Sequence, residues 1–290
     1  MIRLGTPYDI AAMKRLWDEC FNDNVSYIDF IFDKVSKPSD AMVYEEDGRI
    51  VAMLLMIPTR FVLKKEIINS LYVFGACTAR KYRGQGIMTK LLKQAEIRAM
   101  NSGAGLSLVV PGDRALFDYY TARGYDQVLS HRRVQIDRLD LNSVRAEPEN
   151  VSIDIVDPYE VFKTRYLSLR DIPNIAWSGK QMEFVIDDAQ IYGGHCAVYN
   201  GSSGQGIAFF NTQRRRTFVN ECVATSEEAQ LTLLKTIMVR EQPRVLTLDL
   251  PVTSPLFSEY GTIVPYGLAK SLSVKGSFEE IYTYMNMMLD

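Results

Sequence analysis

The chain has 290 residues, which is enough for two domains of ordinary size. Hydrophobic residues make up 47% of the sequence and charged residues 23%, a composition typical of globular proteins. Lysine and arginine number 33 against 35 aspartates and glutamates, and this formal net charge of -2 gives no reason to expect nucleic acid or an anionic membrane as a partner.

The first half of the sequence alternates short strands with helices. Apolar residues recur at helical spacing between residues 8 and 21, and a second helix is expected over 26–35. Strands are predicted at 1–4, 41–44, 49–56, 59–63, 67–77, 106–110 and 127–136, and a short helix at 115–122. A long amphipathic helix is predicted at 84–102, with Ile87, Leu91, Leu92, Ala95, Ile97 and Met100 facing inward.

The second half repeats this order of elements after a polar linker at 137–150. Strands are predicted at 151–156, 195–199, 206–211, 217–224, 245–250 and 269–274, and helices at 159–169, 180–191, 227–239, 255–260 and from 278 onward. We therefore predict an α/β (α+β) protein with domains at 1–140 and 150–290. Each domain is expected to be a mixed, mostly antiparallel sheet flanked by helices.

One stretch carries residues suited to binding a diphosphate. Arg83, Gly84, Gln85 and Gly86 lie between an expected strand and the long helix. A turn there directs main-chain N–H groups at one point near the positive end of the helix dipole, and glycines let phosphate oxygens approach the main chain. An arginine adds a fork of donors that suits phosphate. A Walker A loop and a dinucleotide fingerprint do not fit this spacing, whereas an ordinary glycine-rich helix start remains an alternative.

This stretch resembles motif A of the GCN5-related N-acetyltransferases (GNAT), whose signature is Arg/Gln-x-x-Gly-x-Gly/Ala. Arg83 and Gly86 match it, and Met88 stands where the family usually has a small residue. The segment 117–125 resembles the family's Tyr-x-x-x-Gly-aromatic pattern, with Tyr120 at the tyrosine position. The resemblance covers about residues 67–128.

The layout of the whole chain is similar to tandem-domain GNAT proteins, including those of the enhanced-intracellular-survival type. The second half has Thr225-Ser226-Glu227-Glu228 before its long helix, so it is expected to be a degenerate GNAT-like domain that does not hold the cofactor in the same manner. Members of that type carry a third, sterol-carrier-like domain, which we do not expect here.

The resemblance implies an acyltransferase that uses acetyl-CoA as its co-substrate. A primary amine, on a small molecule or a peptide, would attack the thioester directly in a ternary complex. Thr78 would donate its N–H to the developing oxyanion, and Tyr120 would be the general acid for the coenzyme A sulfur. The residues expected to bind the cofactor are Ala76, Cys77, Thr78, Arg83, Gly84, Gln85, Gly86, Ile87 and Met88.

Other candidate site residues lie outside these two motifs. Trp17, Phe21, Asp23, Tyr27 and Phe30 belong to the helices that cover the acceptor pocket in this family, and Trp177 and residues 192–195 are candidates for its other wall. No general base is assigned: Glu45 and Glu46 are expected in a solvated turn, and His131 and His195 are expected to be structural or surface residues. The Asp290 carboxylate is given no role, and residues 214–216 are expected to form an exposed turn.

The remaining expectations concern location and partners. Cys20, Cys77, Cys196 and Cys222 are scattered, with no pattern for zinc or disulfides, and Cys77 is expected to be a packing residue. A cytoplasmic protein without a metal or a membrane anchor is therefore expected, and exposed strand edges leave room for a homodimer. A non-catalytic acyl-CoA-binding or regulatory module is the alternative function.

Overall fold

The computed structural model describes residues 1–63, 66–272 and 282–285. Its internal contacts divide the chain into two compact units. The first contains Met1–Phe61, Ile67–Gln127 and the described part of Gly267–Glu279. The second contains Val128–Tyr266 and the described parts of Val62–Glu66 and Glu280–Asp290. Each unit combines a mixed sheet with flanking helices, which confirms the expected α/β class.

The first unit contains most of the elements expected from the first half of the sequence. Its strands are β1 (Ile2–Leu4), β2 (Ala41–Glu46), β3 (Arg49–Leu63), β4 (Glu66–Thr78) and β5 (Leu106–Val109), in that order across the sheet. Its helices are α1 (Ile10–Phe21), α2 (Val25–Phe30), α3 (Ile87–Asn101) and α4 (Arg114–Thr121), with a π-helical turn at Ile31–Val35. The β4–β5 pair is parallel, and the end of β13 (Thr262–Ser271) pairs antiparallel with β5.

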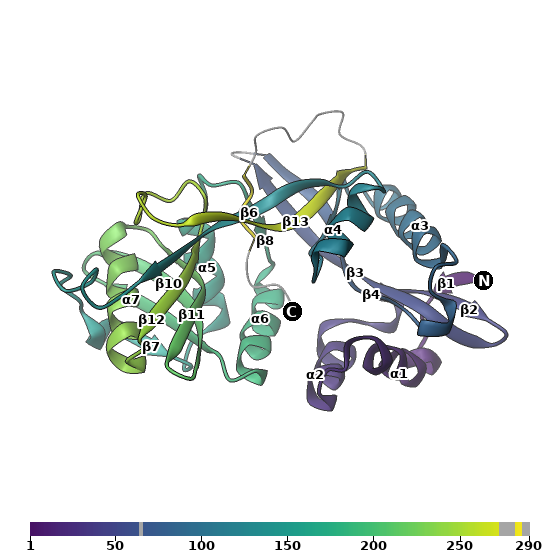
Figure 1. Cartoon of the computed structure of the whole chain (residues 1–290), viewed down its shortest axis with the longest axis horizontal. Coiled ribbons are helices and arrows are strands. Elements are labelled where there is room, and N and C mark those ends of the chain that lie inside the picture. The colour runs from purple at the N-terminus through teal and green to yellow at the C-terminus, as the bar shows by residue number, and fades with distance from the viewer. Residues whose placement is uncertain (64–65, 273–281, 286–290) are drawn as a thin grey trace. The chain divides into compact units, whose positions relative to one another are not determined.

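Alternating side chains of β4 bury opposite faces of this sheet. Leu71 and Val73 join the core cluster that contains Leu91 of α3. On the other face, the ring of Phe74 lies 5.3 Å from that of Trp17 in α1. Figure 1 shows α1 and α2 on one side of β3 and β4 and α3 on the other. The period-two pattern of a strand thus places α1 and α3 on opposite sides of β4.

Two details of the first unit differ from the sequence prediction. The expected strands at 49–56 and 59–63 are one strand, β3, which passes through Pro58. Pro58 is exposed within the strand, a position where proline is tolerated more readily than in a central ladder. In α3, Ile97 and Met100 were expected to face inward but are 37% and 44% exposed, because the buried face is limited to Ile87, Leu91, Leu92 and Ala95.

The second unit has a sheet with the order β6-β12-β11-β10-β9-β7. These strands are β6 (Asp126–Ile136), β7 (Val151–Ile153), β9 (His195–Gly201), β10 (Gly204–Gln213), β11 (Arg216–Ala224) and β12 (Val245–Leu250), with β8 at Asn174–Ala176. Helix α7 (Glu227–Glu241) covers one face, and α5 (Pro158–Ser168) and α6 (Gly179–Ile191) cover the other (Figure 1). Leu233, Leu234 and Ile237 of α7 are fully buried in its core.

The helix expected at 255–260 is absent. This segment forms turns, and Phe257 has a positive φ of 50°. The guanidinium of Arg132 donates to the carbonyl oxygens of Ser254, Leu256, Phe257 and Tyr260, at 2.6 to 3.0 Å. Because these carbonyls bind a side chain from β6, they do not form a helical ladder.

The last predicted helix, from residue 278, falls mostly outside the described residues. Within the part that is described, Thr283 and Tyr284 form isolated bridges with Leu129 and Asn174. Those two residues are therefore extended, in contrast to the prediction, because their backbone groups pair with neighbouring strand segments.

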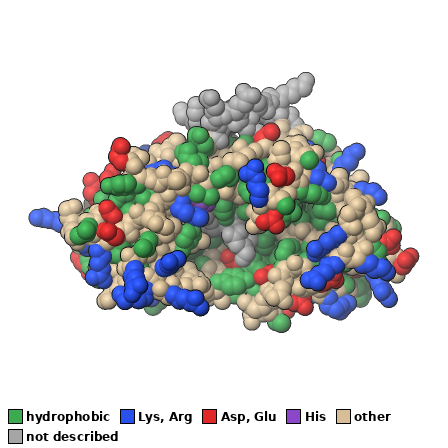
Figure 2. All heavy atoms as spheres, in the orientation of Figure 1, with side chains coloured by type: hydrophobic (Ala, Val, Ile, Leu, Met, Phe, Trp, Pro, Cys, Tyr) green, Lys and Arg blue, Asp and Glu red, His purple; other side chains and the backbone are tan. Residues whose placement is uncertain are grey.

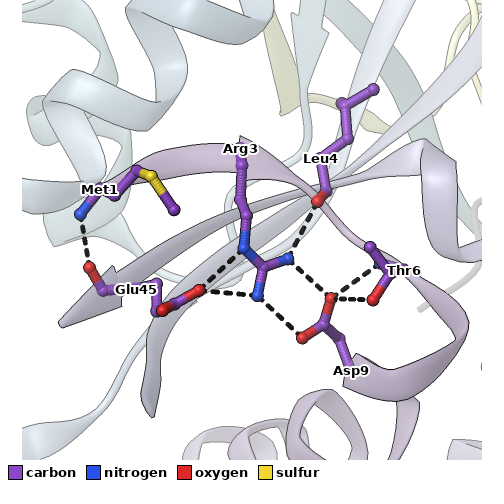
Figure 3. A network of polar contacts seen from close by, with 6 residues as sticks. All are labelled: Met1, Arg3, Leu4, Thr6, Asp9 and Glu45. Atoms are coloured by element: carbon purple, nitrogen blue, oxygen red, sulfur yellow. Dashed lines mark hydrogen bonds and ion pairs between the residues drawn. The ribbon is translucent and has the colours of Figure 1, made fainter. Parts of the chain in front are cut away.

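An ion-pair network fixes the beginning of the chain to the first sheet (Figure 3). Arg3 on β1 bonds both oxygens of Asp9, at 2.7 and 2.9 Å, and its Nε lies 2.8 Å from Oε2 of Glu45. Asp9 also accepts the Thr6 N–H at 2.8 Å, capping the short 3-10 helix at Pro7–Asp9. Glu45 lies at the end of β2, so it is a structural ion-pair partner and not the solvated turn residue expected from sequence.

We expect the Asp9→Asn variant to lose about 1–2 kcal/mol of stability at pH 7, because it loses the charge that faces Arg3. Arg3 holds the pKa of Asp9 well below its usual range. This contribution is therefore present above the unfolded pKa of about 3.9 and is lost as the pH falls toward the folded value. Thermal unfolding of both proteins at pH 7 and pH 3 checks this, and the gap between them should narrow at pH 3.

The Asp40→Asn variant is the matched control for this prediction. Asp40 caps the next 3-10 helix by accepting the Lys37 N–H at 2.8 Å, as Asp9 does for Thr6, but no arginine of the described residues pairs with it. Because Asp40 lacks this ion pair, the loss from Asp40→Asn should be smaller than that from Asp9→Asn at pH 7. Equal losses for both variants would show that Arg3 adds nothing beyond the cap.

The surface carries charges of both signs. Figure 2 shows lysine and arginine side chains and acidic side chains spread over the visible face, with hydrophobic side chains between them. This distribution agrees with the small net charge of -2. No helix in the described part of the chain is both long and apolar enough to cross a membrane.

Candidate functional site

The site begins with a distortion near the end of β4. Gly75 has a φ of 58°, which favours glycine. A Cβ atom at this position would lie 2.2 Å from the Trp17 ring, so a side chain there would collide with α1. The distortion of β4 and the packing of Trp17 therefore require a glycine at the same residue.

Beyond this point β4 extends past its parallel neighbour. The register of β4 with β5 runs from Ser70 to Val73, whereas β4 continues to Thr78. The N–H of Ala79 donates to Val51 of β3 at 2.9 Å. Because successive residues of a strand direct their backbone groups to opposite edges, the N–H and C=O of Thr78 point away from β3. This end of β4 has an edge that β5 does not pair.

The next segment, residues 79–86, is called here the glycine loop. It contains a 3-10 turn at Arg80–Tyr82, followed by Gly84 and Gly86 with φ values of 75° and 72°. A Cβ atom at either glycine would meet nothing within 4 Å, so the backbone conformation and not packing within the chain demands glycine there.

The N–H groups from Gly84 to Thr89 are free at the start of α3. The first helical bond recorded there runs from the Lys90 N–H to Gly86 O at 3.2 Å. Gly86 offers no side-chain cap, and the first turn of α3 has no acidic residue. Within the described part of the chain, no acceptor is recorded for these N–H groups. The helix start therefore has unused donors and the positive end of a dipole, which together suit an anion.

Arg83 links the glycine loop to β4 and α1. Its Nε donates to the Thr78 carbonyl at 2.9 Å, and its Nη2 lies 3.6 Å from the sulfur of Cys20. The side chain is exposed, and its hydrogen bonds hold it beside the end of β4. The guanidinium has further N–H donors that these two contacts do not use, and these remain available to a ligand.

The other residues predicted to bind the cofactor lie along the same path. Gln85 donates to the Lys81 carbonyl at 3.4 Å, which closes the loop on itself. Ile87 is 4% exposed, so its side chain belongs to the core while its N–H belongs to the helix start. Cys77 is 5% exposed, and Ala76 and Met88 are half-buried.

Tyr120 of α4 lies in the core of the first unit. Its ring makes edge contacts with Tyr119 and Tyr125, at centroid distances of 5.2 and 5.6 Å. Burial, and then the neighbouring Tyr119, raise the pKa of Tyr120 well above that of an ordinary tyrosine. No hydrogen bond from its hydroxyl is recorded among the described residues. The raised pKa means that Tyr120 stays protonated at neutral pH, and no acceptor for its hydroxyl is found among the described residues.

The helices expected to cover an acceptor pocket form an aromatic cluster. Trp17 is 2% exposed, and its ring lies 4.8 Å from that of Phe21 and 5.7 Å from that of Phe32. Its indole N–H donates to Asp23 at 2.7 Å. Tyr27 and Phe30 are also buried, so most of this set is core and Asp23 orients the tryptophan.

The two histidines both lie in the second unit. His131 is 1% exposed and its Nε2 lies 3.2 Å from Asp249. Burial lowers its pKa, so it is a structural residue as expected. His195 is half-buried, with Nδ1 2.6 Å from Asp154.

The structure also places the remaining candidates, except Asp290, which lies outside the described residues. Trp177 is 3% exposed and Tyr192 is 42% exposed, both in the second unit. Arg214 and Arg215 form the turn between β10 and β11, with φ values of 49° and 62°. These two arginines therefore lie in the turn that was expected at residues 214–216.

The long helix of the second unit begins differently from α3. The side chain of Ser226 caps α7 by accepting the Ala229 N–H at 3.0 Å. Glu227 and Glu228 stand in its first turn. A capped helix start with two carboxylates disfavours an anion, whereas the open start of α3 favours one.

Sequence reasoning missed the contact of Cys20 with the glycine loop. Helical spacing places Cys20 on the apolar face of α1, but it cannot indicate a partner 63 residues away. No cysteine pattern marks it either.

Among the described residues, no group of three or more His, Cys, Asp or Glu side chains could hold a metal ion.

Comparison with known proteins agrees with this geometry. Residues 1–128 match the family model described as an acetyltransferase (GNAT) domain. The match includes β4, the glycine loop, α3 and α4. A search of the curated proteins found no match. The GNAT match supports acyltransferase activity. GNAT domains in general use acetyl-CoA as co-substrate and act on amines.

Solved structures with the same fold cover nearly the whole chain. A "Probable N-Acyltransferase" from Enterococcus faecalis has a TM-score of 0.76 at 15% identity, covering 94% of this chain and 73% of that one. A GCN5-related N-acetyltransferase from Kribbella flavida has a TM-score of 0.75 at 15% identity, covering 94% and 71%. Eis1 from Mycobacterium abscessus has a TM-score of 0.73 at 13% identity, covering 95% and 74%. At these identities the likeness concerns the fold.

Proposed function

We propose that this protein is an N-acetyltransferase that moves an acetyl group from acetyl-CoA to a primary amine, in one step within a ternary complex. The observation that carries the proposal is the open start of α3. Six successive N–H groups, from Gly84 to Thr89, have no recorded acceptor among the described residues, and Arg83 stands beside them. This arrangement suits the two linked phosphates of coenzyme A.

The unpaired end of β4 suits the rest of the cofactor. A pantetheine chain can lie along this edge as an additional strand, because the Thr78 N–H points away from β3 and β5 does not pair this end of β4. The Thr78 N–H then faces the thioester and can donate to the oxyanion as it forms. In this arrangement Ala76, Cys77 and Thr78 hold the thioester end, and residues 83–88 hold the phosphates.

Tyr120 supplies the hydrogen bond for the departing sulfur. Its raised pKa makes a complete proton transfer less favourable than with an ordinary phenol of pKa about 10. Tyr120 therefore acts mainly as a hydrogen-bond donor that stabilises the thiolate as it forms, and its proton follows late in the step. This refines the general-acid role expected from the sequence.

The acceptor is a small-molecule amine or a peptide amino group. It must reach the thioester as the neutral amine, because only the neutral nitrogen has the lone pair that attacks the carbonyl carbon. The second unit is proposed to be a degenerate GNAT-like domain of a tandem pair that does not bind acetyl-CoA, because the start of α7 is capped by Ser226 and carries two carboxylates. A chain with this arrangement is expected to hold one coenzyme A.

Isothermal titration calorimetry with coenzyme A tests the site through Gly86. The Gly86→Ala variant should bind coenzyme A about tenfold more weakly, which corresponds to one lost charge-assisted hydrogen bond of about 1.5 kcal/mol. The wild type should bind one equivalent. Absence of any binding to the wild type would refute the proposal.

The Gly103→Ala variant is the control for the backbone effect. Gly103 follows α3 with a φ of 85°, and a Cβ atom there also meets nothing within 4 Å. Both substitutions impose a similar left-handed strain, of about 1 kcal/mol, and should lower the melting temperature equally. Only the change at Gly86 should weaken binding. Equal affinities for the two variants would place the phosphates elsewhere.

A further inference from the structure

Cys20 is located where three parts of the first unit meet. It lies in the last turn of α1 and is half-buried. Its thiol donates to the Thr78 carbonyl, with the sulfur and oxygen 3.5 Å apart, and accepts from Arg83 at 3.6 Å. One sulfur thus contacts both the end of β4 and the glycine loop.

A second thiol lies against this sulfur. Cys77, on β4, is 5% exposed and its side chain interacts directly with that of Cys20. The two cysteines are 57 positions apart in the sequence and come together because α1 packs on β4 through Trp17 and Gly75. Only Cys20 of the pair is open to solvent.

The surroundings of Cys20 favour its ionised form. Hydrogen bonding with Cys77 is the largest effect and the guanidinium of Arg83 adds to it, whereas burial and the Glu19 carboxylate oppose it; together they lower the pKa of Cys20 to about 6. When the thiol loses the proton that it donates to the Thr78 carbonyl, Arg83 and Cys77 remain as donors to the sulfur. A thiolate beside an arginine, with access to solvent, is the reactive form of cysteine.

The other cysteines of the chain provide the contrast. Cys196 and Cys222 are both 0% exposed, and burial raises their pKa values well above that of an ordinary thiol. Neither has a described cationic neighbour among the causes of its shift. Buried thiols without a cation are unreactive, so the chain has internal controls for any reaction at Cys20.

We propose that Cys20 is a site of oxidation by peroxides and that Cys77 is its resolving partner. The Cys20 thiolate attacks one oxygen of hydrogen peroxide: an S–O bond forms, the O–O bond breaks, and hydroxide leaves and is protonated to water. The sulfur becomes a sulfenic acid and the peroxide is reduced. The Cys77 sulfur then attacks the Cys20 sulfur: the S–O bond breaks, and the proton of Cys77 leaves with the oxygen as water.

The two steps should differ in rate. Burial raises the pKa of Cys77, so its sulfur attacks more slowly than that of Cys20. The sulfenic acid at Cys20 should therefore live long enough to be trapped by dimedone. The resulting disulfide removes the negative sulfur that Arg83 contacts and leaves the Thr78 carbonyl as its partner. Oxidation thus alters the surroundings of an arginine on the glycine loop.

Peptide mass spectrometry of the folded full chain tests this proposal. The protein is treated with hydrogen peroxide, blocked with N-ethylmaleimide and digested without a reductant. The wild type should give a peptide pair joined through Cys20 and Cys77, with Cys196 and Cys222 still reduced. Cys77→Ala loses the hydrogen bond that most favours the Cys20 thiolate, so its oxidation should be slower, but without a resolving thiol it should accumulate dimedone-reactive Cys20. Cys20→Ser should leave Cys77 reduced. Circular dichroism must show that both variants are folded.

A pH profile in the reduced wild type provides the second measurement, which needs no variant. At pH 6 about half of Cys20 should be thiolate, against roughly 0.3% for a cysteine of ordinary pKa about 8.5. The larger thiolate fraction speeds thiol exchange by more than about a hundredfold, whereas the lower basicity of this thiolate reduces its nucleophilicity by about tenfold. Exchange with 2,2′-dithiodipyridine at pH 6 should therefore be about tenfold faster for Cys20 than for a cysteine in an unfolded peptide. Peroxide oxidation that is no faster at Cys20 than at Cys196, or an exchange midpoint near pH 8.5, would overturn the proposal.

Discussion

Replacing Tyr120 by phenylalanine is expected to lower kcat for acetyl transfer by about 100-fold, while the affinity for coenzyme A stays within about threefold. The ring remains packed between Tyr119 and Tyr125, and only the hydroxyl is lost. Because this hydroxyl has no recorded protein partner among the described residues, its removal leaves no buried acceptor unpaired. Steady-state kinetics with acetyl-CoA and a panel of primary amines, together with calorimetry, measure the two quantities separately.

The Tyr119→Phe variant is the matched control. Tyr119 is the adjacent residue of α4, and its hydroxyl lies 3.4 Å from that of Thr89 on the exposed side. Its loss should change kcat by less than about threefold. Equal losses for both variants would exclude a special role for Tyr120. A wild type that binds coenzyme A but acetylates no amine in the panel would favour the non-catalytic alternative.

The Arg165→Met variant is expected to destabilise the second unit by about 3–5 kcal/mol, because it leaves a buried carboxylate without its partner. Arg165 on α5 is 3% exposed and Glu221 on β11 is 0% exposed. The guanidinium bonds both carboxylate oxygens, at 2.6 and 3.3 Å, and the carbonyl of Ile175 at 3.0 Å. No other cation is recorded as a partner of Glu221 in the described part of the chain.

Urea unfolding followed by tryptophan fluorescence measures this loss. The sequence has two tryptophans, Trp17 in the first unit and Trp177 in the second. In a Trp17→Phe background, the remaining signal reports only on the second unit. All variants should be compared in that background.

Two further variants decide whether the missing partner is the cause. Replacing both residues, Arg165→Met with Glu221→Leu, should recover most of the stability, because no buried charge remains. Arg170→Met breaks an exposed pair, in which Arg170 lies 3.1 Å from Asp171, and should change stability by less than about 0.5 kcal/mol. A double variant as unstable as Arg165→Met would point to lost packing instead.

The elements around the candidate site could be predicted because their features are local in sequence. The change from strand to glycine-rich turn to amphipathic helix lies within residues 67–101, and each part has its own signal. The positive φ values of Gly84 and Gly86 are the conformations for which glycine is selected. The order of strands and helices also followed from periodicity in both halves.

The contacts between distant segments could not be predicted. Nothing in the spacing of residues indicates that Arg132 binds four carbonyls of the 254–260 segment, which is why a helix was wrongly expected there. The same holds for Cys20 beside Arg83 and for Arg165 beside Glu221. Each depends on tertiary packing, which overrides local preference, and a single sequence gives no pairing information.

The pairing of β13 with β5 limits how the acetyltransferase part of the chain can be isolated. Leu268 is 0% exposed in the core that contains Tyr120 and Leu91, and residues 268–271 complete the sheet beside β5. An expression fragment that stops near residue 140 would lack this strand, leaving a hydrophobic hole and a bare sheet edge in the core that contains Tyr120. Minimal enzymes cut from the N-terminal half would therefore be prone to aggregation, and intact protein is the suitable material for assays.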